Sequence, residues 1–172
     1  MTAIAPYRII SYILLPIAAL FGFMGLLMLI LALSNPAIMI PTLIIMVIVV
    51  YIILSFIFFM KAVENGKKCK PTLRKWITAT GIIAGLFSFT TLFNCIALFY
   101  APDQIKTTID QSMAMQKNMP AISSDLMVKV FKGVLYFMVF FATTLIIHVY
   151  ETLKLIKQYQ ESFIAHDTHE EW

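Results

Sequence analysis

The segment Lys61–Lys75, with the sequence KAVENGKKCKPTLRK, determines how the rest of this chain is arranged. It contains six lysine and arginine residues against a single acid, Glu64, and it lies between two long apolar segments. A short, strongly basic loop in this position is typical of the cytoplasmic side of a membrane protein. We therefore predict that residues 61–75 connect two transmembrane helices on that side of the bilayer.

The composition excludes an ordinary soluble domain. Of the 172 residues, 60% are hydrophobic and 13% are charged, whereas soluble domains average about 45–50% apolar and about 25% charged residues. The formal charge of +4 does not indicate nucleic-acid binding, because the basic residues border the apolar segments instead of forming a separate patch. Anionic lipid headgroups are the partner that this distribution favours.

Four apolar segments predict transmembrane helices, because about 20 residues are needed to cross the bilayer core. The segments are, with approximate bounds, residues 9–33, 41–60, 76–100 and 132–151, and the outer loop is 102–129. A signal peptide is the alternative for the first segment, although such apolar regions usually have only about 7–15 residues. The predicted fold class is an all-α integral membrane protein, a single domain of four bundled transmembrane helices with the last helix extended into the cytoplasm.

The distribution of cations orients this bundle. Nine of the 13 lysine and arginine residues lie on the side of the basic loop, and four lie in or beside the longer outer loop. This excess predicts that the N-terminus and the C-terminus are both cytoplasmic, in a protein of the cell (inner) membrane. The two cysteines, Cys69 and Cys95, then lie at different depths of the bilayer, which argues against a disulfide.

The second and third apolar segments differ in polarity. Residues 42–60 are almost uniformly aliphatic and aromatic, with Tyr51 among the few polar side chains, so we expect this helix to face lipid or a partner subunit. The third segment is the most polar, and its Gly81 and Gly85 in GIIAG are followed one turn later by Ser88. Small residues at this spacing permit close helix contact, which predicts that the third helix is central in the bundle.

Two polar residues inside the predicted spans are candidate functional residues. His148 is ionisable and lies well inside a span, and such residues often mark functional sites. Asn94 lies toward the opposite side of the bilayer, so the two are roughly 15–20 Å apart along the membrane normal and form no catalytic pair. Each is interpreted as a structural hydrogen-bonding residue, with contact to a partner or ligand as the alternative.

No motif in the sequence indicates catalysis. The predicted spans contain no Asp, Glu, Lys or Arg in their interiors, and the chain has neither HExxH nor a nucleophile with a positioned base. We therefore expect no enzyme activity, no cofactor and no metal site. The alternatives are a Cu(I) site at Met113, Met115 and Met119, or a metal site at His166 and His169.

Two amphipathic patterns lie outside the four spans. Ile105, Ile109 and Met113 recur every fourth residue in the outer loop, which predicts a helix lying on the membrane surface. Beyond the last span an apolar stripe continues among charged residues, and it consists of Leu153, Ile156, Phe163 and Ile164. We expect this stripe to be the principal contact with a protein partner, with shielding by the basic loop or insertion into the inner leaflet as the alternatives.

These features favour a small non-catalytic integral membrane subunit, an accessory, assembly or regulatory component that packs against other integral membrane proteins or itself. One alternative is an oligomeric small transporter or channel lined by the polar face of the third helix. Another is a metal or stress-response membrane protein that uses the methionine string. The candidate partner or packing residues are Gly81, Gly85, Ser88, Asn94, His148, Leu153, Ile156 and Phe163.

The orientation can be tested by labelling single cysteines in intact cells with a membrane-impermeant thiol reagent, in a variant without Cys69 and Cys95. A cysteine that replaces Lys117 in the outer loop is expected to react. A cysteine that replaces Lys68 in the basic loop is expected to react only after the membrane is permeabilised. Labelling of position 68 in intact cells would show that the orientation is inverted.

Overall fold

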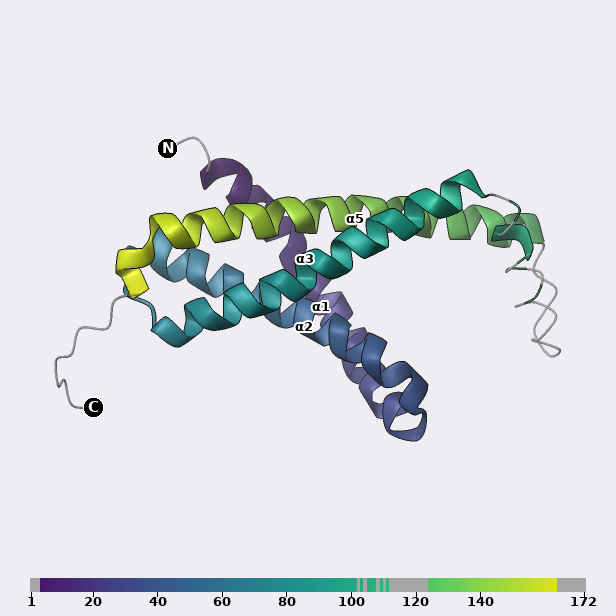
Figure 1. The fold of residues 1–172 in the computed structure, drawn as a ribbon, viewed down its shortest axis with the longest axis horizontal. Coiled ribbons are helices and arrows are strands. Elements are labelled where there is room, and N and C mark those ends of the chain that lie inside the picture. Colours follow the sequence, from purple (N-terminus) through teal and green to yellow (C-terminus); the bar gives the residue numbers. More distant parts are fainter. Residues whose placement is uncertain are drawn as a thin grey trace. The chain divides into compact units, whose positions relative to one another are not determined.

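The computed structural model contains only helices as regular elements among the residues that it describes, which are 4–101, 103, 105–107, 109, 111 and 124–163 (Figure 1). The four long helices are α1 (Ile4–Ser34), α2 (Met39–Phe58), α3 (Pro71–Tyr100) and α5 (Ser124–Gln158). Each lies in a segment long and apolar enough to cross a membrane. The predicted fold class, an all-α integral membrane protein with four transmembrane helices, is confirmed.

The turn between α1 and α2 forms at the residues that the sequence indicates. α1 ends at Ser34, and the side-chain oxygen of Asn35 accepts a hydrogen bond from the Ala37 amide at 3.1 Å. This bond caps the short 3-10 helix η1 (Pro36–Ile38), which leads into α2. Asparagine followed by proline therefore ends the first span and starts the second one.

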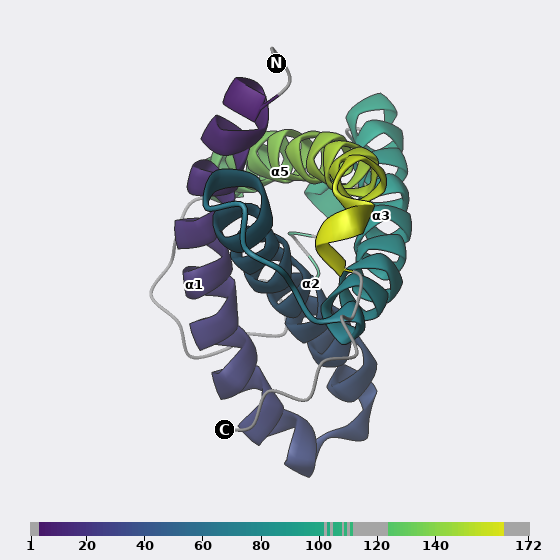
Figure 2. The ribbon, with the colours of Figure 1, turned by 90° about the vertical axis from the view of Figure 1, so that its left-hand side faces the viewer.

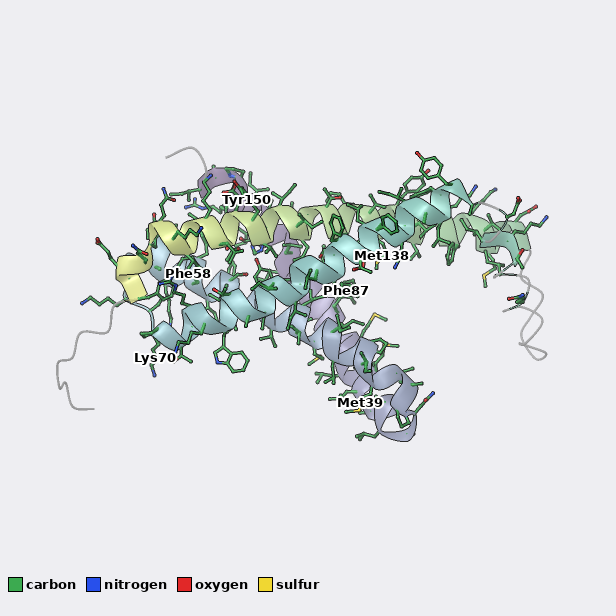
Figure 3. All side chains as sticks on the ribbon, in the orientation of Figure 1. Met39, Phe58, Lys70, Phe87, Met138 and Tyr150 are labelled. Atoms are coloured by element: carbon green, nitrogen blue, oxygen red, sulfur yellow. The ribbon has the colours of Figure 1, made fainter. Side chains whose placement is uncertain are left out.

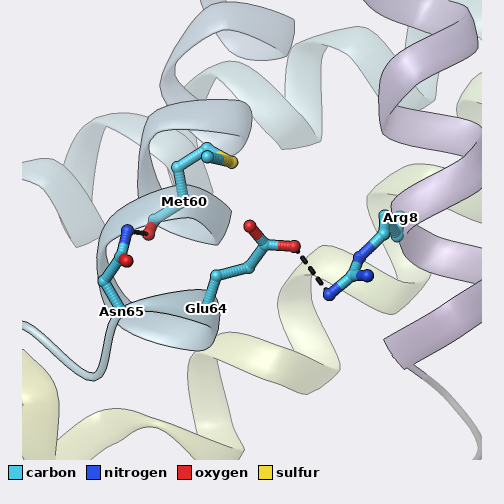
Figure 4. Close-up of polar contacts among 4 residues, drawn as sticks. All are labelled: Arg8, Met60, Glu64 and Asn65. Carbon is cyan, nitrogen blue, oxygen red and sulfur yellow. Dashed lines mark hydrogen bonds and ion pairs between the residues drawn. The ribbon is translucent and has the colours of Figure 1, made fainter.

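The end of α2 is wound more widely than an α-helix. The chain continues as a π-helical turn, η2 (Phe59–Glu64), after which the Asn65 side-chain amide donates to the Met60 carbonyl at 2.5 Å (Figure 4). Gly66 then adopts a left-handed conformation with φ of 61°, which a residue with a side chain rarely adopts. Asn65 and Gly66 therefore end the second span, as this pair of residues commonly does.

The chain divides into two compact units, which are described separately. Unit 1 comprises Met1–Phe87 and Leu145–Trp172, and unit 2 comprises Ser88–Thr144. α3 and α5 therefore each contribute one part to unit 1 and another part to unit 2.

α1 and α2 form an antiparallel pair in unit 1 (Figure 1). The Tyr12 ring meets Phe56 edge-on toward one end of the pair, and Gly25 approaches Met46 toward the other end. A β-carbon at Gly25 would lie only 2.8 Å from the Met46 sulfur. The missing side chain thus allows the two helices to approach closely.

The start of α1, the basic loop and the end of α5 lie at one end of unit 1 (Figure 2). Arg8 forms an ion pair with Glu64 at 2.8 Å (Figure 4). From the basic loop, the Cys69 amide donates at 2.8 Å to the Ser162 carbonyl in the 3-10 helix η3 (Gln160–Phe163). The first and last described parts of the chain are therefore on the same side of unit 1 as the basic loop.

The second helix is more buried than the third, the reverse of what we expected when we placed the third helix at the centre of the bundle, although Leu43, Val50 and Ile53 of the second helix are exposed. Within its most apolar stretch, the span containing α2 is 39% buried, compared with 17% for α3. Tyr51, Ser55 and Phe58 of α2 are almost inaccessible. The Tyr51 ring packs against Gly81 of α3, so the small residue of the third helix contributes to burial of the second helix.

The apolar stripe beyond the last span is covered by the chain itself. Ile156 and Phe163 are only 3% and 5% exposed, and Phe163 stacks on Phe58 with ring centroids 5.3 Å apart. We expected the last helix to continue through this stripe, but α5 ends at Gln158, and η3 then contacts α2 through the stack of Phe163 on Phe58. The expectation that these two side chains are open to a protein partner is therefore wrong.

Unit 2 has its own small apolar cluster. Cys95 of α3 and Leu135 of α5 pack with Ile105 and Ile109, which have helical backbone conformation. Both isoleucines are buried. Ile105 and Ile109 thus have helical backbone as expected, and their side chains pack against other apolar side chains of the unit. Met113, the third residue of that pattern, lies outside the described residues.

The surroundings of Gly81 and Gly85 predict unequal effects of substitution. A β-carbon at Gly81 would lie 3.1 Å from the Tyr51 ring, whereas one at Gly85 would meet Val149 at 3.8 Å, an ordinary contact distance. We expect Gly81→Leu to lower the free energy of unfolding by about 1–3 kcal/mol through overpacking. The matched control Gly85→Ala should leave thermal unfolding in detergent nearly unchanged. Identical melting of Gly81→Leu and the wild type would contradict this packing.

Candidate functional site

Six buried polar side chains from three helices meet in unit 1, and we refer to them as the His148 cluster. Each is at most 1% exposed. α1, α2 and α5 contribute two residues each, and the two are four positions apart, so each pair lies on one face of its helix. The members are Tyr7 and Ser11, Tyr51 and Ser55, and His148 and Thr152.

The His148 ring is held at both of its nitrogens. Nε2 lies 3.1 Å from the Ser11 hydroxyl, and Nδ1 lies 3.0 Å from the Tyr51 hydroxyl. One turn later on α5, the Thr152 hydroxyl lies 3.1 Å from that of Tyr7 and 3.0 Å from that of Tyr51. The Thr152 hydroxyl itself donates to the His148 carbonyl at 2.7 Å.

One arrangement of protons satisfies all of these contacts. Because the Thr152 hydroxyl donates its proton to the His148 carbonyl, the Thr152 oxygen accepts hydrogen bonds from the hydroxyls of Tyr7 and Tyr51. The Tyr51 oxygen then accepts from Nδ1–H of His148, and Nε2 accepts from the Ser11 hydroxyl. This bonding pattern assigns His148 as the neutral tautomer protonated at Nδ1.

Aromatic rings enclose the imidazole. The Tyr7 ring stacks on His148 with centroids 4.9 Å apart, and the Tyr51 ring meets it edge-on at 5.6 Å. The Tyr7 ring also contacts the Phe59 ring, with centroids 5.2 Å apart. Fully bonded polar groups in an enclosed environment of this kind make a core rigid and define one packing arrangement.

The geometry of the cluster fits a structural role better than a chemical one. A serine hydroxyl close to an imidazole nitrogen resembles a nucleophile with its base, but Ser11 and His148 are both enclosed, which denies a substrate access. No group of three or more His, Cys, Asp or Glu side chains that could hold a metal occurs among the described residues. We interpret the His148 cluster as a hydrogen-bonded cross-link among α1, α2 and α5.

The sequence identified His148 but not the residues that bond to it. A signal was present in the three polar pairs at i, i+4 spacing, because each pair places two polar side chains on one face of an otherwise apolar helix. Tyr7 was missed because it precedes the predicted start of the first span, and Tyr51 because it was read as one polar group in a lipid-facing helix. Thr152 lies just past the predicted end of the last span.

The other candidate residues are dispersed over both units. Gly81 and Gly85 pack against side chains within unit 1, Ser88 is buried, and Leu153 is half-buried. Asn94, in unit 2, is exposed, and no hydrogen bond of its amide is described. The residues of the alternative metal sites and the last residue of the apolar stripe lie outside the described part of the chain, namely Met113, Met115, Met119, Ile164, His166 and His169.

Cys69 is the cysteine of the basic loop, and it is buried. Burial raises the pKa of its thiol, and the nearby Lys61 ammonium opposes part of this effect. At a given pH the reactive thiolate is therefore scarcer than in an exposed cysteine. This environment favours a structural role for Cys69, whose amide holds η3 against the basic loop.

Comparison of this chain with protein-family models, with curated proteins and with solved structures finds no match.

The hydrogen bonds of Tyr51 predict a specific loss of stability. Tyr51→Phe keeps the ring against Gly81 but leaves the Nδ1–H of His148 without its acceptor. We expect a decrease of about 1–3 kcal/mol in the free energy of unfolding, since a buried donor then lacks a partner. Tyr12→Phe, at an exposed tyrosine of α1, is the matched control and should melt like the wild type. A Tyr51→Phe variant as stable as this control would exclude a stabilising role for the cluster.

Proposed function

We propose that this protein is a small non-catalytic integral membrane subunit that packs against other membrane proteins as an accessory, assembly or regulatory component. The observation that carries the proposal is the exposure of Asn94 on α3. A carboxamide in hydrocarbon without a hydrogen-bonding partner is costly, so such a residue favours association with another helix.

The contrast between Asn94 and the His148 cluster supports this proposal. Inside unit 1, the side chains of His148 and Tyr51 have their hydrogen-bonding partners within the chain. The Asn94 amide has none among the hydrogen bonds described for residues 4–101 and 124–163. An exposed amide without a described partner inside the chain is suited to bond to another chain.

The surface around Asn94 is apolar and rich in aromatic residues. Phe89, Phe93 and Tyr100, on other faces of the same outer part of α3, are strongly exposed, and Figure 3 shows side chains along the whole of this helix. Ala97 lies one turn from Asn94, which allows the backbone of a second helix to approach the amide. Aromatic side chains with a few polar groups are typical of interfaces between proteins.

The proposed orientation has both termini in the cytoplasm of a cell with the protein in its inner membrane. The number of cations in the basic loop supports this orientation. The contacts Arg8–Glu64 and Cys69–Ser162 agree with it, because they join the first turns of α1 and the 3-10 helix η3 to the basic loop.

The alternative of a pore lined by the polar face of α3 has less support. Thr80, one of the polar residues of α3, is buried, and its hydroxyl donates to the Trp76 carbonyl at 2.6 Å in the same helix. A continuous water-filled path along α3 needs this hydroxyl to be exposed.

The test is purification in a mild detergent followed by mass spectrometry of the proteins that are retained. Asn94→Leu is expected to reduce retention of a membrane partner, or of a second copy, about tenfold, which corresponds to the loss of about 1–2 kcal/mol from one interhelical hydrogen bond. Asn94→Gln keeps the amide and is the matched control, so most of the retention should remain. Full retention by Asn94→Leu would remove the support for this surface, and solute flux through the purified protein in vesicles would favour the pore.

A further inference from the structure

An open groove of about 660 Å³ lies where the first turns of α3 and the 3-10 helix η3 meet in unit 1. Two cations stand at the start of α3, and small or apolar side chains follow along the same helix. The wall includes Arg74, Lys75, Thr78, Ala79, Ile82 and Phe163. The groove therefore combines a basic end with an apolar end.

The basic end carries positive charge that no described acid neutralises. Two ion pairs are described among residues 4–101 and 124–163, Arg8–Glu64 and Glu151–Lys154, and neither involves Arg74 or Lys75. Glu161 of η3 is exposed and does not belong to the groove wall.

The apolar end reaches into the depth of the membrane. Arg74 and Ile82 are eight residues apart, which corresponds to about 12 Å along a helix. Trp76 on the same helix is 58% exposed, and an exposed tryptophan beside lysine and arginine marks the level of the lipid headgroups. The groove thus passes from the headgroup region into the hydrocarbon, where Ala79 and Ile82 lie.

We propose that this groove binds one anionic phospholipid. The phosphate lies between Arg74 and Lys75, and one acyl chain lies along the exposed side chains of Ala79 and Ile82. Free phosphate makes no contact with the apolar end of the groove, whereas a phospholipid contacts both ends. A zwitterionic phospholipid has the same acyl chains, but its cationic headgroup cancels the charge that the two basic residues attract. The site is separate from Asn94 and does not depend on the proposed function.

The test is native mass spectrometry of the full-length protein in a mild detergent, titrated with phosphatidylglycerol or with phosphatidylcholine. One tightly bound phosphatidylglycerol per chain is expected, with much weaker binding of phosphatidylcholine. The double substitution Arg74→Gln with Lys75→Gln should weaken phosphatidylglycerol binding about 25-fold, because each cation at a membrane surface contributes about fivefold. Lys67→Gln with Lys68→Gln removes the same charge from exposed positions that do not belong to the groove wall, and should have little effect.

A second substitution tests the apolar end without a change of charge. Ala79 is exposed in the groove wall, so Ala79→Trp fills the groove without disturbing the buried contacts of unit 1. It should weaken phosphatidylglycerol binding about tenfold, since the acyl chain loses its apolar contact area, while the melting temperature stays that of the wild type. Ile82→Ser, at another exposed wall position, provides an independent reading.

Three results would overturn the proposal. Equal weakening by the two double substitutions would show that the lipid responds to general positive charge and not to the groove. Undiminished binding by Ala79→Trp and Ile82→Ser would show that no acyl chain lies there. Equal affinity for phosphatidylcholine and phosphatidylglycerol would remove the role of the two cations.

Discussion

The packing of unit 1 depends on the Tyr51 side chain, which connects three helices at once. Its hydroxyl bonds to His148 and Thr152 of α5, and its ring lies against Gly81 of α3. Within a bilayer, packing and hydrogen bonds hold helices together, because lipid tails are as apolar as the side chains of the core. Because the ring and the hydroxyl of Tyr51 each have fixed contacts, this residue determines how α2 is rotated about its axis and how far along its neighbours it lies.

The spans and their boundaries were predictable because they depend on local chemistry. Apolar length identifies a spanning helix, and Asn35 with Pro36 or Asn65 with Gly66 ends one whatever surrounds it. The partner of a polar side chain is a different matter, since Tyr51 and His148 are separated by almost 100 residues. Their contact depends on how two helices are rotated about their axes relative to each other, and a local stretch of sequence does not specify that rotation. The polar pairs at i, i+4 spacing indicate a face, but not which faces meet.

The C-terminal apolar stripe also shows that sequence identifies an apolar face but not the residues that cover it. Its periodic pattern identifies an apolar face at Ile156 and Phe163, but the surface that covers it comes from Phe58 and the basic loop. The basic loop therefore does two things in this fold, since it follows a spanning helix and also holds η3 through the Cys69 amide. With that stripe covered, the proposed contact with other chains moves into the membrane, to the exposed outer part of α3.

The π-helical turn η2 has a consequence for how the length of this chain can vary. A π turn accommodates one residue more than an α turn, so the residues after it point as they would in an α-helix one residue shorter. If the same sequence were α-helical throughout, Glu64 would be rotated by about 100° away from Arg8. Removal of one residue between Phe59 and Glu64 would convert η2 into an ordinary turn and still leave this ion pair facing. The end of α2 is thus a position where one residue can be lost while the basic loop keeps its direction.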